Sequence, residues 1–341
     1  MISRDTDWDG VRLHVVTGKG GTGKTTVAAA MALALASAGR KVLLIEVEGR
    51  QGIARLFDAP PLPYAERKIA LGLGARDEGG DVYALAVDPE GALLDYLAMF
   101  YNLRRAGTAL TKLGVVDFAT TIAPGLSDVL VTGKATEATR RRIRPGAKDS
   151  PHVYDAVVMD APPTGRIGRF LNVSTEVSDL AKVGPIRTHA DTVAKVIRSP
   201  QTAVHFVTTL EEMPVQETLD GLAELRDLTG GAIAAGGVFV NMVRATMLGK
   251  DELAAAVSGT LDVAALATGL KQAGIGDEQT LAADLAIELK EHALQVRLQD
   301  RTREAIRTAG RPRYELPMLT DGVDLAGLYE LAAALREQGA A

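Results

Sequence analysis

One stretch of the sequence decides the fold class: Gly18-Lys19-Gly20-Gly21-Thr22-Gly23-Lys24-Thr25-Thr26. It matches the pattern G-x-x-x-x-G-K-[ST], which binds nucleotide phosphates when it follows a strand and opens a helix. Glycines let such a loop wrap closely around a phosphate chain, so that its N–H groups and the helix N-terminus face the anion. Lys24 is expected to reach the β- and γ-phosphates, Thr25 to ligate Mg²⁺, and Thr26 to contact an earlier phosphate.

The segments on either side of the loop supply the strand and the helix that the pattern requires. Val11 to Thr17 is a short apolar run and predicts a buried strand, and Lys41 to Val47 predicts a second one. Lys24 to Ser37 is rich in Ala and Leu and stops at Gly39, which predicts a helix. Strand, glycine loop, helix and strand form the opening unit of a parallel doubly wound sheet.

The remaining chain continues this alternation. Pro89 to Arg144 has helical periodicity with little strand signal, and helices are also predicted from Pro214, over 251–308 with a break around 269–277, and over 324–338. We therefore expect an α/β P-loop NTPase fold, a mostly parallel doubly wound sheet with helices on both faces. A single domain spans 1–341, with a helical insertion at 89–145. Further strands are predicted over 82–87, 154–159, 203–208, 237–240 and 313–316.

A redox dinucleotide is the main alternative ligand for this loop. Residues 18–23 also fit G-x-G-x-x-G, and the second strand ends in Glu46 and Glu48, where dinucleotide-binding folds keep a ribose-binding acid. The Lys24-Thr25 pair favours a nucleoside triphosphate instead, because a dinucleotide turn has no use for a Lys-Thr pair at the start of its helix.

Composition narrows the functional classes. The 341 residues are 47% hydrophobic and 24% charged, with a net charge of −5, and none is cysteine. This composition is typical of a folded globular protein and disfavours non-specific nucleic-acid binding. The lack of cysteine excludes disulfides, zinc–thiolate sites, iron–sulfur clusters and a thiol nucleophile.

The longest apolar run, Val27 to Ala36, is shorter than the roughly 20 residues that span a bilayer, and the N-terminus lacks an apolar signal core. We therefore expect a cytoplasmic protein.

Lys19 points to a second subunit. A lysine directly after the first glycine does not easily contact phosphate in its own subunit when the loop has its usual shape. It can reach a nucleotide across a face-to-face dimer and neutralise transition-state charge there, as an arginine finger does. The alternative, a solvated loop lysine, is disfavoured by the surrounding motif.

Three further stretches accompany the loop: Leu43 to Phe57, Met159-Asp160-Ala161-Pro162-Pro163-Thr164-Gly165-Arg166, and Val238-Phe239-Val240-Asn241, with Glu315-Leu316-Pro317-Met318 near the end. Together with the loop they resemble the deviant Walker A ATPases, and within them the arsenite-efflux and tail-anchored-protein-targeting (anion-transporting) ATPase family. The resemblance runs from about Val11 to Leu335. Within that family the chain resembles the bacterial type that has one half, with a single phosphate loop, and no cysteine.

The resemblance implies roles for individual residues. Glu48 takes the place of the Asp that positions the attacking water in the family's first switch, and Gln51 stands where the family has His. In the second switch Asp160 would hold the Mg²⁺ hydration shell, and Arg166 replaces the family's His. A surface acid at a strand end is the alternative for Glu48.

Asn241 stands where the family's Asn contacts the adenine edge, and Pro317 and Met318 where the family covers the adenine ring. Turn formation is the alternative for Asn241, and packing for the other two. ATP and Mg²⁺ are the implied cofactors, with Thr25 and Asp160, the latter through water, at the metal. The implied catalytic residues are Lys19, Lys24, Glu48 and Asp160; the implied nucleotide-binding residues are Gly18, Gly20, Gly21, Thr22, Gly23, Lys24, Thr25, Thr26, Gly165, Asn241, Pro317 and Met318.

The implied function is a dimeric ATP-hydrolysing switch that couples its nucleotide state to a client or partner. One phosphate loop means that two chains complete the site, as a homodimer or as a heterodimer with a diverged paralogue. Without cysteine, neither the metalloid site of the efflux relatives nor the zinc clamp of the eukaryotic targeting relatives is expected. In the family, helices between the switches form an apolar client groove, and Leu93 to Tyr101 is rich in apolar side chains here. A hydrophobic protein client or a membrane partner would fit such a groove, whereas interior packing is the alternative.

Three other functions stay open. A partition or positioning ATPase would need a basic DNA-binding surface or a basic amphipathic membrane helix, for which the sequence offers little. A small-molecule kinase or ligase would need an acceptor pocket. A weakly hydrolysing scaffold paired with a paralogue is compatible with Glu48 and Arg166. We expect no nucleic-acid partner.

Overall fold

The computed structural model describes residues 7–73, 80–88, 90–95, 126–147, 149–180, 185–246, 248–320 and 322–341. An eight-stranded sheet runs through the centre in the order β3-β4-β2-β5-β1-β6-β7-β8. Neighbouring strands are parallel except β3, which is antiparallel to β4. The α/β P-loop NTPase fold is therefore confirmed. The strands are β1 (Leu13–Gly18), β2 (Val42–Glu46), β3 (Arg67–Leu71), β4 (Asp81–Ala86), β5 (Ala156–Asp160), β6 (Thr202–Thr208), β7 (Ala235–Val243) and β8 (Arg313–Pro317).

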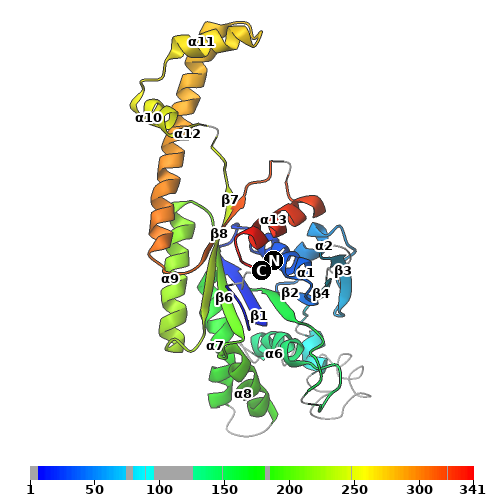
Figure 1. Ribbon diagram of the computed structural model, residues 1–341. Helices are drawn as coiled ribbons and strands as arrows, with labels where there is room; N and C mark the ends of the chain where they lie inside the picture. Colours follow the sequence, from blue (N-terminus) through cyan, green and yellow to red (C-terminus); the bar gives the residue numbers. More distant parts are fainter. Residues whose placement is uncertain are drawn as a thin grey trace.

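Helices cover both faces of the sheet (Figure 1). Alternate residues of each central strand point to opposite faces, so Val16 and Leu44 join one core and Val15 and Leu43 the other. The first core is covered by α1 (Lys24–Ser37), α2 (Gly52–Leu56) and α13 (Leu325–Glu337). The second is covered by α6 (Leu126–Arg140), α7 (Thr164–Leu180), α8 (Pro185–Ile197) and α9 (Glu212–Thr229).

Most of the predicted elements are confirmed, with ends shifted by at most three residues. The helix predicted over Lys24–Ser37 is α1, with the same bounds, and its residues from Val27 onward are buried because small Ala side chains allow a close approach to the sheet. The predicted break in the C-terminal helical region is wrong in part, because a helix runs through Gly269. Of the insertion predicted at 89–145, α6 is helical, and residues 96–125 lie outside the described residues.

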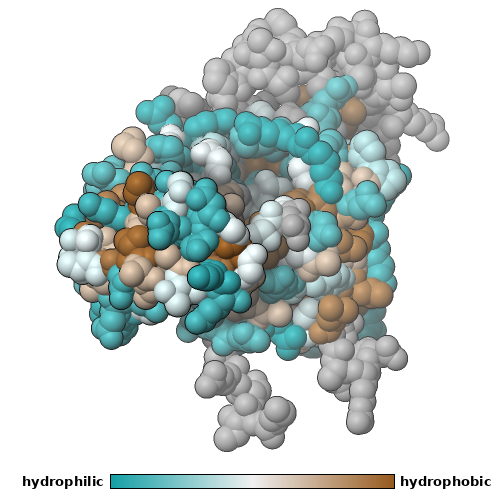
Figure 2. All heavy atoms as spheres, turned by 90° about the horizontal axis from the view of Figure 1, so that it is seen from above, coloured by the Kyte–Doolittle hydropathy of each residue, from teal (hydrophilic) through white to brown (hydrophobic). Residues whose placement is uncertain are grey.

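Two further features were not predicted. β3 is an exposed antiparallel edge strand whose Arg-Lys-Ile-Ala-Leu sequence carries no buried-strand signal. Three helices also form an arm that projects beyond the carboxyl ends of the strands: α10 (Lys250–Ser258), α11 (Val263–Gln272) and α12 (Glu278–Arg307) (Figure 1). Apolar side chains lie among polar ones on the surface seen from above (Figure 2). Large apolar side chains exposed on the arm are Val263, Ile275, Leu281, Ile287, Leu294 and Leu298.

A histidine pair lies buried within the central sheet. His14 of β1 and His205 of β6 are fully buried, and His14 Nδ1 lies 3.1 Å from His205 Nε2. The N–H of Gly237 donates to His205 Nδ1 at 3.1 Å, so the proton of His205 is on Nε2 and is donated to His14. Burial, with a smaller contribution from Arg40, lowers the pKa of His14 to about 3. Burial also lowers the pKa of His205 well below its usual value.

We predict that acidification from pH 6.5 to 5 lowers the free energy of unfolding. In this window the unfolded chain progressively binds protons on both histidines, whereas the folded chain keeps them neutral. For each histidine, stability therefore falls by about 0.7 kcal/mol per pH unit at pH 6.5 and by about 1.4 kcal/mol per pH unit near pH 5. His14→Gln should lose about half of the contribution that the buried pair makes to this slope, whatever its stability at neutral pH. Urea unfolding at several pH values measures the slope. His292→Gln, in a partly exposed position on α12, is the matched control and should keep the wild-type slope. An unchanged slope in His14→Gln would contradict a neutral buried pair.

Candidate nucleotide site

The phosphate loop connects β1 to α1 at the carboxyl ends of the strands. Two of its glycines allow it to pack closely against β6 and β7. A Cβ atom on Gly18 would overlap the backbone carbonyl of Val207 in β6. Gly23 has a φ of +83°, and a Cβ there would overlap the side chain of Asn241. Because larger residues would push the loop away from β6 and β7, glycine is required at both positions.

Side chains also hold the loop in place. Asn241 Nδ2 donates a hydrogen bond to the carbonyl oxygen of Thr22 at 2.9 Å. Thr22 Oγ1 donates in turn to the carbonyl oxygen of Lys19 at 2.8 Å. Asn241 is buried, and its amide nitrogen is engaged by the loop. The structure thus brings Asn241 to the phosphate loop, and its contact with adenine stays a prediction.

Thr25 and Asp160, both predicted to serve the metal, lie in contact although 135 residues separate them in the chain. Thr25 Oγ1 donates to Asp160 Oδ2 at 2.6 Å. The second oxygen of Asp160 is buried and without a partner among the described residues, and so is Oε1 of Glu46, the neighbour of Asp160 in the β2–β5 register. A hydroxyl beside two unsatisfied carboxylate oxygens suits Mg²⁺, which keeps several waters and binds few protein ligands. The residues present therefore fit this ion.

Negative charge is concentrated at this point. Burial raises the pKa of Asp160 to about 6, and the nearby carboxylates of Glu46 and Glu48 act in the same direction. The hydrogen bond from Thr25 and the charge of Lys24 oppose the shift. A cation at this point would relieve both burial and repulsion, so the site is arranged to receive positive charge.

The sequence pattern did not assign Glu46 to the triphosphate site. Its Oε2 accepts a hydrogen bond from the N–H of Ile53 at 3.0 Å, which ties the end of β2 to α2 in the first-switch segment. A carboxylate inside an apolar strand is the signal that could have identified it, because an ionisable side chain is rarely buried there without a role. Gln51, in the same segment, binds both backbone groups of Leu62 at 2.7 and 3.2 Å.

Beside the two segments predicted to be switches lies a polar cavity of about 230 Å³, lined in part by Glu48, Arg50, Asp128 and Arg166. The Glu48 side chain is 23% exposed and its Oε2 lies 3.7 Å from Arg50 Nη2. Arg166, on α7, lies 3.9 Å from Asp128 on α6. Burial raises the pKa of Asp128, and the charge of Arg166 opposes this shift. Asp128 was not predicted as a site residue, because nothing local in the sequence distinguishes it from any other acid in a first helical turn.

The remaining predicted residues lie at the same edge of the sheet. Lys19 Nζ lies 2.5 Å from Glu217 Oε1 of α9. Gly165 lies in the first turn of α7. Pro317 pairs with Val243 across β7 and β8, and the N–H of Met318 donates to the carbonyl oxygen of Val243 at 2.9 Å. The side chain of Met318 is exposed, so it is free to contact a ligand.

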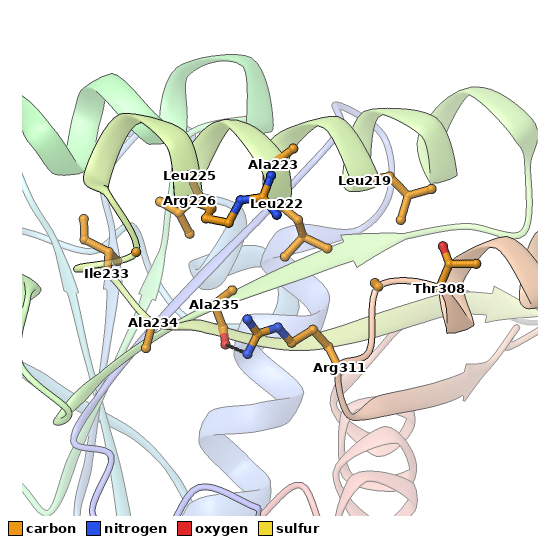
Figure 3. Close-up of a pocket in the computed structure, with 12 residues that line it drawn as sticks. Leu219, Leu222, Ala223, Leu225, Arg226, Ile233, Ala234, Ala235, Thr308 and Arg311 are labelled. Atoms are coloured by element: carbon orange, nitrogen blue, oxygen red, sulfur yellow. Dashed lines mark hydrogen bonds between the residues drawn. The ribbon is translucent and has the colours of Figure 1, made fainter.

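A pocket of about 400 Å³ lies elsewhere, between α9, the start of β7 and the end of α12 (Figure 3). Arg226 and Arg311 line it together with apolar side chains, and Arg311 Nη1 donates to the carbonyl oxygen of Ala235 at 3.2 Å. Because it lies at the amino end of β7, at the opposite edge of the sheet from the phosphate loop, it is separate from the nucleotide site.

In the described part of the chain, no three or more His, Asp or Glu side chains are grouped so that they could hold a metal ion. No described helix is both long and apolar enough to cross a membrane.

Known proteins resemble this chain over most of its length. The family described as anion-transporting ATPase matches residues 11–199. ATPase BagA of Mycobacterium tuberculosis is 51% identical over 330 residues, which cover 97% of this chain and 94% of that protein. ATPase get3 of Botryotinia fuckeliana is 25% identical over 221 residues, which cover 64% of this chain and 58% of that protein.

We predict that Asp160→Asn stabilises the nucleotide-free protein by about 1–3 kcal/mol at neutral pH. At this pH the folded chain carries a buried carboxylate whose raised pKa makes folding less favourable, and a neutral amide removes that cost while still accepting the Thr25 hydrogen bond. Urea unfolding without nucleotide or magnesium measures the change. Asp227→Asn, at a position that is 70% exposed, should change stability by less than about 0.5 kcal/mol. A less stable Asp160→Asn variant would argue against this electrostatic account.

Proposed function

Since the chain belongs to the anion-transporting ATPase family and is an ATPase, we propose that it works as a nucleotide-controlled dimeric switch. In this proposal residues 1–341 act as one domain, with residues 89–145 inserted as the part that meets a client or partner. The contact of Thr25 with Asp160 beside unpartnered carboxylate oxygens is the observation that carries the proposal. It supports a site for a triphosphate with Mg²⁺, because a redox dinucleotide needs neither the Thr25 hydroxyl nor a carboxylate for a metal ion.

The phosphate loop would bind the triphosphate through its N–H groups, the α1 N-terminus and Lys24. Thr25 would hold Mg²⁺ directly, and Asp160 would hold it through water. When bound, the ion neutralises charge on the phosphates. Glu48 lines the polar cavity, where its carboxylate would accept a hydrogen bond from water and orient that water toward the γ-phosphate.

Two contacts support transmission of the nucleotide state to the rest of the chain. Glu46 binds the start of α2, so a change at the end of β2 reaches the first switch. Arg166 lies beside Asp128 in α6, which belongs to the proposed insertion. Loss of the γ-phosphate would remove charge next to both contacts, and both segments would relax. A client or partner bound by the insertion would then respond to hydrolysis.

A weakly hydrolysing scaffold is the second candidate. The observation that favours it is the position of Arg50 Nη2, 3.7 Å from Glu48 Oε2, which engages the carboxylate that would orient water. The turnover number separates the two candidates. A scaffold binds ATP tightly and hydrolyses it no faster in its assembled form than as an isolated chain.

We predict different outcomes for the two loop lysines. Lys24→Ala should abolish turnover and weaken ATP binding, because it removes the cation at the β- and γ-phosphates. Lys19→Ala should lower turnover by at least about a hundredfold and change ATP affinity less than about twofold, because its charge acts on the other protomer's nucleotide. Phosphate release and nucleotide titration measure the two quantities. Lys68→Ala, in the exposed strand β3, is the control. Full turnover in Lys19→Ala would remove the cross-subunit role.

We also predict that a non-hydrolysable ATP analogue with Mg²⁺ doubles the molar mass of the pure chain, because two loops close on two nucleotides. Size exclusion with light scattering measures this mass, and Lys24→Ala should stay monomeric. A monomer at saturating nucleotide would contradict the homodimer. Turnover that then needed a paralogous ATPase would establish the heterodimer instead.

A further inference from the structure

Lys19 contacts a carboxylate of its own subunit. Its Nζ lies 2.5 Å from Glu217 Oε1, although 198 residues separate the two in the chain. The side chains are 30% and 38% exposed, so the ion pair lies at the surface of the loop and can be reached by a partner. It is the one ion pair that ties the phosphate loop to another element in the described part of the chain.

The backbone on both sides of this ion pair is held firmly. Thr22 Oγ1 binds the carbonyl oxygen of Lys19 at 2.8 Å, which restrains the loop backbone. On α9, Thr218 and Gly221 are buried, and a Cβ on Gly221 would lie 3.0 Å from the ring of Phe206 in β6. This close packing fixes the helix on the sheet and directs Glu217 toward the loop. With both backbones held, the side chains of Lys19 and Glu217 are the parts of this contact that can move.

From this arrangement we infer that Glu217 is a positioning residue that retains Lys19 in its own subunit until nucleotide replaces it. The inference rests on the proposed cross-subunit role of Lys19. In the isolated subunit Glu217 holds the ammonium at 2.5 Å, so a phosphate bound by another chain has to compete with Glu217 for it. In this inference, closure of the dimer moves the ammonium from the carboxylate to the phosphate. A triphosphate carries more negative charge than one carboxylate and attracts the ammonium more strongly, so nucleotide drives the exchange.

The magnitude of the effect follows from the exposure of the pair. A partly exposed ion pair between flexible side chains changes an equilibrium by about two- to fivefold, and salt screens it. Glu217 thus raises the ATP concentration at which the dimer forms, by a modest factor and without blocking closure. Its effect depends on Lys19, because no other loop cation in the described chain is paired with it.

Glu217→Gln tests the inference, because it keeps the size of the side chain and removes its charge. The measurement is the ATP-analogue concentration that gives half-maximal dimer, by light scattering. We expect this concentration to fall about two- to fivefold at low salt, with the difference shrinking as sodium chloride is raised. Glu224→Gln removes the same charge from an exposed position further along α9 and should leave the concentration unchanged.

A double-mutant cycle shows whether Glu217 acts through Lys19. In the Lys19→Ala background, Glu217→Gln should have no further effect on dimer formation. If Lys19→Ala dimerises and turns over ATP like the wild type, the cross-subunit role fails, and the inference fails with it. If Lys19→Ala is impaired but Glu217→Gln shows an unchanged or higher midpoint, only the retaining role of Glu217 is overturned.

Discussion

The close packing of the phosphate loop against its neighbouring strands is the constraint on which the rest of the structure depends. Gly18 and Gly23 leave no room for a side chain, and Asn241 binds the loop carbonyl of Thr22. The loop is therefore shaped before any ligand arrives, and its N–H groups need little reorganisation to meet a phosphate chain. Preorganisation of this kind is what makes fixed dipoles effective against developing charge.

Carboxylates are concentrated at the same edge of the sheet. Parallel strands end at one edge of the sheet, so Glu46 at the end of β2 lies beside Asp160 at the end of β5, below the loop. Without a cation this arrangement costs free energy, since a buried acid next to other acids prefers to stay protonated. The ligand-free protein stores that cost, and magnesium with nucleotide can offset it. Stability is thus traded for a site that favours a bound cation.

Two charge pairs link elements at the carboxyl ends of the strands to parts of the chain that lie further away. Lys19 of the phosphate loop meets Glu217 on α9, and Arg166 of α7 meets Asp128 on α6. α9 also packs against α12, the long helix of the projecting arm. Under the proposed function, a change in the charge of the nucleotide would act on both pairs, and through them on the proposed insertion and on the helix beside the arm.

By itself the sequence determined the phosphate loop, α1 and the buried parallel strands, because glycine spacing and apolar runs are local signals. The family followed from those motifs. Local pattern missed β3, whose exposed residues resemble a loop, and it did not associate Glu46 or Asp128 with the triphosphate site. Only the tertiary structure decided that Asn241 binds the loop and that Glu217 meets Lys19, across 219 and 198 residues respectively. Such contacts depend on strand order and on which helix covers which face, and these are set by packing of the whole sheet, which short-range patterns do not encode.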